Sequence, residues 1–86
     1  MKAHAIVCKS QGKPDVMHLE EVAIGQPAEG QALIRQTAIG VNYLDVYNRA
    51  GVYPLPLPTG IGSEGAGVVE AVGAGVTTLK VGDRIA

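Results

Sequence analysis

Apolar and polar residues alternate in several short segments of this chain, beginning at its N-terminus. In residues 1–8, Ala3, Ala5 and Val7 fall on one side of an extended backbone, and Lys2 begins the other side. Such alternation is typical of a β-strand with one covered face. It predicts strands at residues 1–8, 16–22, 31–39 and 65–72, and a further strand that opens at residues 83–86. Because the first three follow one another without an intervening helix, the sequence predicts an antiparallel β domain.

One segment has helical signals instead. In "NYLDVYNRAG", Asn42 stands at an N-cap position, Asp45 follows three residues later, and Gly51 occupies a C-cap position. The segment predicts a helix of about two turns. The next residues, "VYPLPLPTG", carry three prolines within five residues, which excludes a central strand and predicts a stiff, extended loop.

Composition narrows the class of protein. A chain of 86 residues is one small domain whose core is marginal unless another surface covers it. Seven Lys and Arg against eight Asp and Glu, with no basic run, argue against nucleic acid and anionic membranes as partners. The single cysteine, Cys8, excludes an internal disulfide, and no apolar run approaches the roughly 20 residues of a membrane span. We therefore expect a cytoplasmic location.

The stretch "TGIGSEGAGV" contains Gly60, Gly62 and Gly65 with the spacing of a dinucleotide-binding loop. That loop needs a buried strand before its first glycine and a helix after its third. Here prolines precede the glycines, and an alternating strand pattern follows them. Asp83, at the distance of a ribose-binding acidic residue, lies in "KVGDR", which is typical of a tight turn. We therefore interpret the glycines as positions for close backbone packing and positive φ.

The segment "AIGVNYLDVYNRAGVYPLPLPTGIGSEGAGVVEAVGAGVTTLKVGDRIA" resembles the medium-chain dehydrogenase/reductase superfamily, and within it the zinc-free, zeta-crystallin-like quinone oxidoreductases. The opening "GKPDVMHLEEV" is similar to the start of that family as well. The resemblance implies that residues 1–86 are the N-terminal portion of a GroES-like catalytic domain, mainly β, with a partial barrel and one short helix. It also implies an NADPH-binding Rossmann domain after residue 86, missing from this chain, and a homodimeric complete protein.

The resemblance also bears on zinc. The zinc-dependent branch of the superfamily places a cysteine and a histidine ligand where this chain has Asn42 and Ser63. An amide and a hydroxyl are poor substitutes for thiolate and imidazole. We therefore expect no catalytic zinc.

By the same resemblance, Asn42 and Tyr47 are candidate catalytic residues, and these two with Tyr53 are candidate cofactor-binding residues beside the nicotinamide. Each has a structural alternative: Asn42 as the helix N-cap, Tyr47 as a core residue, and Tyr53 as packing for the proline loop. The two roles of Asn42 are compatible, because capping uses only its side-chain oxygen.

Four further polar residues are expected to be structural. Asp45 is predicted to cap the helix from position N3, and Glu64 to be buried and hydrogen-bonded rather than catalytic. His4 and His18 lie on strand-like segments, and we expect surface or strand-packing roles for them.

The resulting expectation is a complete protein that transfers hydride from NADPH, without metal, to a quinone or another small α,β-unsaturated carbonyl compound. The 86-residue chain alone is expected to be inactive. The alternatives are an enoyl reductase or an alcohol dehydrogenase of the same superfamily. A third alternative is a stand-alone, co-chaperonin-like β-barrel interaction module that uses "GVYPLPLPTGIG" as a mobile loop.

Overall fold

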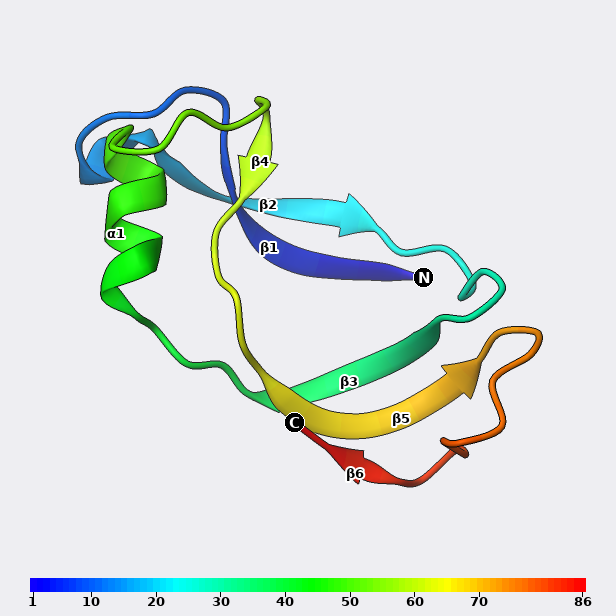
Figure 1. The fold of residues 1–86 in the computed structure, drawn as a ribbon. Coiled ribbons are helices and arrows are strands. Elements are labelled where there is room, and N and C mark those ends of the chain that lie inside the picture. Colours follow the sequence, from blue (N-terminus) through cyan, green and yellow to red (C-terminus); the bar gives the residue numbers. More distant parts are fainter. The chain divides into compact units, whose positions relative to one another are not determined.

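The computed structural model describes all of residues 1–86, which form β-strands, one α-helix and one 3₁₀ turn (Figure 1). The chain divides into two units, and each unit is made of two separate stretches. The first contains Met1–Ile24 and Val41–Ser63, and the second contains Gly25–Gly40 and Glu64–Ala86. The prediction of a mainly β fold with one short helix is confirmed.

The first unit is built on a three-stranded sheet with the order β2-β1-β4. Strand β1 (Lys2–Cys8) pairs antiparallel with β2 (Met17–Ala23) along its whole length, and the 3₁₀ turn η1 (Pro14–Val16) precedes β2. The short strand β4 (Thr59–Gly60) pairs with the end of β1 on its other edge. Exposure alternates along β1, as the apolar pattern predicts.

Helix α1 (Tyr43–Ala50) also belongs to the first unit, and it begins and ends where the sequence predicts. Its N-cap, Asn42, has an extended backbone, and its C-cap, Gly51, has a φ of 95°, which favours glycine. The backbone N–H groups of Gly51 and Val52 both donate to the Tyr47 carbonyl at 3.1 Å. With eight residues, α1 is not long and apolar enough to cross a membrane.

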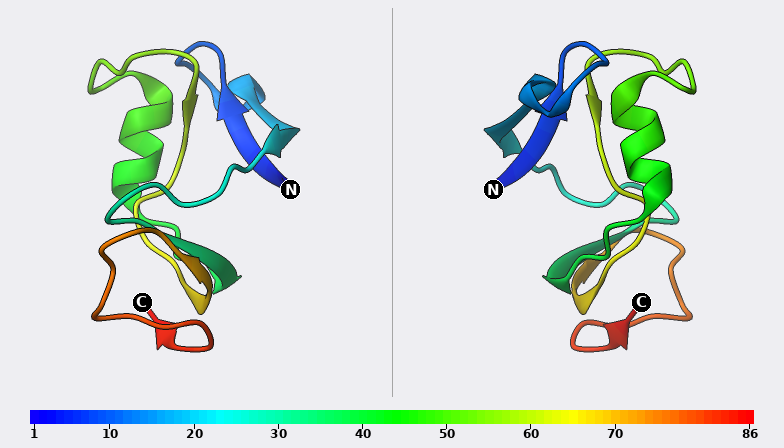
Figure 2. Two further views of the ribbon diagram at one scale, coloured as in Figure 1. Left: turned by 90° about the vertical axis from the view of Figure 1, so that its right-hand side faces the viewer. Right: turned by 90° about the vertical axis from the view of Figure 1, so that its left-hand side faces the viewer.

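The second unit is a three-stranded antiparallel sheet with the order β3-β5-β6, whose longer strands run side by side in Figures 1 and 2. Strand β3 (Ala32–Ala38) pairs with β5 (Ala66–Val72), and β6 (Arg84–Ile85) pairs with the start of β5. The pairing of β3 with β5 is interrupted by two register shifts. Such irregularities bend a strand and increase its twist.

Few side chains are fully buried. Cys8 in the first unit and Val69 in the second are the buried apolar residues, and Asp45 is the buried charged one. His4 and His18 are both exposed on their strands, which confirms their predicted surface position. Each unit therefore has a very small core, as the short chain leads one to expect.

Two short elements were not predicted. The strand at Thr59–Gly60 is too short to show a pattern and follows a proline. The 3₁₀ turn at Pro14–Val16 includes the first residue of the strand predicted at residues 16–22. The predicted tight turn before the last strand is confirmed. The backbone N–H of Asp83 donates to the Lys80 carbonyl at 3.1 Å, and Gly82 has a φ of 97°.

Candidate functional site

The N-terminus of α1 is closed by a capping box between Asn42 and Asp45. Oδ2 of Asp45 accepts a hydrogen bond from the backbone N–H of Asn42 at 2.8 Å, and the Asn42 side chain faces the backbone N–H of Asp45 in return. Such reciprocal bonds satisfy N–H groups that lack partners at a helix start. Asp45 is only 5 % exposed, so its carboxylate is built into the helix end. The predicted capping roles of both residues are confirmed.

Three tyrosines form a row on α1 and the loop that follows it. The rings of Tyr43 and Tyr47 lie 6.4 Å apart with a tilt of 36°, and those of Tyr47 and Tyr53 lie 6.3 Å apart, edge to face, at 80°. These distances are typical of favourable aromatic pairs. All three residues are exposed to solvent: Tyr43 by 78 %, Tyr47 by 42 % and Tyr53 by 49 %. The structure thus brings Tyr47 and Tyr53 together, and the alternative of Tyr47 as a core residue is wrong.

Tyr43 is the member of this row that was not predicted as a site residue. The signal was available, because residues four apart on a helix share one face and Tyr43 precedes Tyr47 by four. Ring faces can stack on planar groups, phenol hydroxyls can donate or accept, and the Asn42 amide can donate. Helix α1 and the loop after it therefore offer groups suited to binding and orienting a planar molecule with polar oxygens.

The prediction that Glu64 is buried is wrong, because the structure leaves this residue exposed. Its side chain lies against Gly40, where an added Cβ would overlap the Glu64 carboxylate. The missing Cβ of Gly40 gives the side chain a place along the surface. An exposed carboxylate avoids the desolvation cost that burial of a charge would bring.

The glycines of residues 59–68 serve the backbone and do not form a phosphate loop. Gly62 has a φ of 120°, which side chains rarely tolerate. An added Cβ at Gly65 would overlap the carboxamide of Gln36. Strand β5 begins at Ala66, where a dinucleotide fingerprint requires a helix. The predicted need for glycine is thus confirmed at Gly62 by its positive φ and at Gly65 by its close contact, whereas a Cβ at Gly60 would make only an ordinary contact of 3.9 Å with the Ile6 carbonyl oxygen.

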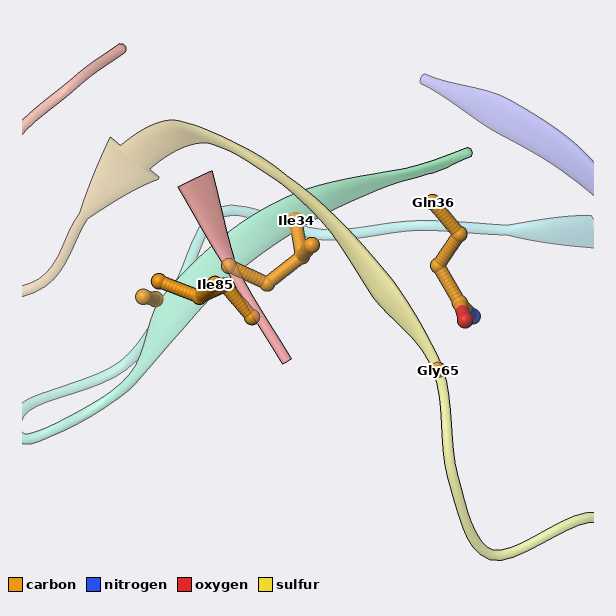
Figure 3. Close-up of a pocket in the computed structure, with 5 residues that line it drawn as sticks. Ile34, Gln36, Gly65 and Ile85 are labelled. Atoms are coloured by element: carbon orange, nitrogen blue, oxygen red, sulfur yellow. The ribbon is translucent and has the colours of Figure 1, made fainter. Parts of the chain in front are cut away.

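The second unit contains an open pocket of about 290 Å³ (Figure 3). Figure 3 shows the side chains of Ile34 and Ile85 close to one another, with the Gln36 carboxamide turned toward Gly65. The lining residues are Ala32, Ile34, Gln36, Gly65 and Ile85. None of them is ionisable, so the pocket offers apolar contact and one carboxamide but no group for acid–base chemistry.

The structure contains no group of three His, Cys, Asp or Glu residues that could hold a metal ion. Cys8 is a buried free thiol on β1. Asn42 and Ser63 supply an amide and a hydroxyl, which are weak ligands for zinc.

The chain belongs to the alcohol dehydrogenase GroES-like domain family, whose model matches residues 28–86. It is 47 % identical over 85 residues to a quinone oxidoreductase of Pseudomonas aeruginosa, and 50 % identical over 86 residues to a 2-haloacrylate reductase of a Burkholderia species. These alignments cover 98 % and 94 % of this chain and 26 % of each relative. The fold is similar to that of the Escherichia coli quinone oxidoreductase complexed with NADPH, with a TM-score of 0.92 and 43 % identity over 95 % of this chain and 26 % of that one.

The chain thus spans about a quarter of the length of these relatives. The predicted resemblance to quinone oxidoreductases and the predicted GroES-like fold are confirmed. The roles of Asn42, Tyr47 and Tyr53 toward cofactor and substrate stay predictions.

Proposed function

We propose that the complete gene product is an NADPH-dependent oxidoreductase that reduces a quinone or another α,β-unsaturated carbonyl compound. The observation that carries this proposal is the 47 % identity to a quinone oxidoreductase across 98 % of the chain. The 2-haloacrylate reductase supports the wider acceptor class, because its named substrate is also a conjugated alkene. A homodimeric assembly and a cytoplasmic location rest on the family resemblance alone and belong to the same proposal.

In this proposal NADPH supplies the hydride, and the chain contributes binding and orientation. The Asn42 amide donates a hydrogen bond to the acceptor oxygen or to the nicotinamide carboxamide, and the Tyr47 phenol is a second donor. The Tyr53 ring covers the reacting groups and helps to exclude water. Binding of this kind places donor and acceptor in a productive geometry, which is itself a large part of catalysis.

The residues of this chain fit the nicotinamide end of NADPH better than its pyrophosphate. The rings and the amide at α1 suit a planar carboxamide, whereas the glycines at residues 59–68 lead into a strand and provide no phosphate cradle. We therefore propose that a Rossmann domain of the complete protein holds the pyrophosphate, and that residues 1–86 alone are inactive.

The proposed reaction does not use zinc. This part of the proposal is supported by the donor set, since Asn42 and Ser63 replace the stronger thiolate and imidazole ligands of the zinc-dependent branch.

The test is steady-state kinetics of the complete gene product, with NADPH consumption measured against benzoquinone, naphthoquinone, 2-haloacrylate, an enoyl thioester and an aldehyde. Reduction of the quinones supports the proposal. Preference for the thioester would favour an enoyl reductase, and turnover of the aldehyde that a chelator abolishes would favour a zinc alcohol dehydrogenase. If no acceptor is reduced and ring-shaped oligomers form, the co-chaperonin-like interaction module becomes the better reading.

Tyr47→Phe tests the site itself, with Tyr43→Phe as the matched control in the neighbouring ring. Loss of the Tyr47 hydroxyl removes a donor, and we expect kcat/KM for the quinone to fall about tenfold. Tyr43→Phe is expected to stay within about twofold, because we assign no donor role to that hydroxyl. Equal kinetics in both variants and the wild type would show that the Tyr47 hydroxyl is not a donor in the reaction.

A further inference from the structure

The loop between β1 and η1 is fastened to the C-terminal end of α1, across which it runs in Figure 1. Nε2 of Gln11 donates to the carbonyl of Asn48 at 2.8 Å and to the carbonyl of Tyr53 at 2.7 Å. Beside it, the backbone N–H of Gly12 donates to the Arg49 carbonyl at 2.8 Å, and Nη1 of Arg49 donates to the Gly12 carbonyl. We call residues Gln11 and Gly12, with these bonds, the loop clamp.

The loop clamp has a clear physical role at the helix end. The last carbonyls of a helix have no partner within the helix. The Tyr47 carbonyl accepts hydrogen bonds from the turn that follows the helix. The carbonyls of Asn48 and Arg49 accept theirs from the loop clamp. The two segments are within contact distance, because a Cβ at Gly51 would lie 3.5 Å from Cβ of Gln11.

The chemistry of the contact favours glutamine at this position. A primary amide nitrogen carries two N–H groups, so one Nε2 can donate to both carbonyls at once. Carboxylate, thioether and hydrocarbon side chains have no N–H group to donate to these carbonyls. Asparagine has the amide, but its side chain is shorter by one methylene. Both partners lie far along the chain, 37 and 42 residues from Gln11.

The two carbonyls belong to Asn48 and Tyr53, which lie next to and at two ring positions of the proposed site. Asn48 directly follows Tyr47, and Tyr53 supplies the other carbonyl itself. We infer that Gln11 is a positioning residue that sets the edge-to-face arrangement of the Tyr47 and Tyr53 rings, and so the affinity of the site for its planar acceptor. The role in affinity rests on the proposed function, whereas the role in ring geometry does not.

The test compares Gln11→Met with Gln26→Met in the complete gene product. Methionine keeps the length of the side chain and removes both donors. Gln26 is an exposed glutamine outside the first unit, so Gln26→Met makes the same chemical change without touching the loop clamp. Gln11→Asn is the milder second variant, which keeps an amide but shortens its reach, and it carries the test if Gln11→Met does not fold.

The first readout is the nuclear Overhauser contact between the Tyr47 and Tyr53 rings, measured without ligand. We expect it to weaken in Gln11→Met and Gln11→Asn and to be unchanged in Gln26→Met. An unchanged ring contact in a folded Gln11 variant overturns the inference, whether or not the protein reduces quinones.

The second readout is the division between KM and kcat for the quinone. Rings that bind ground state and transition state alike affect KM alone. Loss of two neutral hydrogen bonds is therefore expected to raise KM about tenfold, and kcat is expected to fall less than in Tyr47→Phe, because the Tyr47 phenol is displaced but kept. A lost ring contact with normal KM would make Gln11 structural only and overturn its role in affinity. If the wild type reduces no acceptor, the proposed function fails, and the ring contact alone decides the claim about Gln11.

Discussion

Asn42 combines a capping role with a predicted role as a donor to substrate or cofactor, and two substitutions can separate them. Serine is as good an N-cap as asparagine, but its hydroxyl lies too close to the backbone to replace the amide N–H₂. Alanine removes both functions. Serine also avoids placing a second carboxylate beside Asp45, which aspartate would do.

The structure sets the size of each effect. Loss of an N-cap costs about 1 kcal/mol, which corresponds to about fivefold faster exchange of the α1 amide protons. A donor to a developing oxyanion in an enclosed site is worth about 3 kcal/mol. Asn42 is exposed in this chain, so we take a value nearer to that of an ordinary hydrogen bond, about 1.4 kcal/mol, or about tenfold in kcat.

Amide hydrogen exchange and steady-state quinone reduction by the complete gene product measure the two effects independently. We expect Asn42→Ala to lose both protection of α1 and activity. Asn42→Ser is expected to keep the protection and lose the activity. Wild-type kcat in Asn42→Ser, together with low kcat in Asn42→Ala, would refute our reasoning, because it would show that Asn42 acts only through the helix cap.

Three further predictions concern the sheet, the cofactor and the metal. Gly67→Ala should destabilise the pairing of β3 with β5 by about 1–3 kcal/mol, because its Cβ would lie 2.8 Å from the backbone carbon of Arg35. Amide exchange in β3 and β5 measures this loss. The control is Gly25→Ala, whose Cβ would meet nothing within 4 Å and which should be neutral. Calorimetry of residues 1–86 with NADPH should show no tight binding, and a tight complex would contradict our assignment of the pyrophosphate to another domain. Quinone reduction by the complete protein should survive a strong chelator, whereas loss of activity that added zinc restores would contradict the metal-free proposal.

The strands could be predicted from the sequence because alternation is a local property. Their partners could not. Strand β3 follows β2 in the chain but pairs with β5, and the two residues of β4 become a strand only because β1 supplies the pairing edge. Pairing across long separations depends on the tertiary fold, which short-range patterns do not contain.

The same distinction holds at the candidate site. Asn42 and Asp45 of the capping box are only three positions apart, so its signals lie together in the sequence. Gln11 could not be selected, because both of its acceptors lie far away in the chain. The predicted burial of Glu64 was wrong because the tertiary fold leaves its side chain exposed along the surface at Gly40.

Residues of the proposed site lie at both ends of α1, so the order of the site depends on the contacts at both helix ends. Isolated helices shorter than about 12 residues are marginal in water, so a helix of eight residues depends on its end contacts. Asp45 holds the end that carries Asn42, and Gln11 holds the end next to Tyr53. The long strands have ladders of their own. Loss of either end contact should therefore disorder the site while the sheets persist, and amide protection should fall in α1 first.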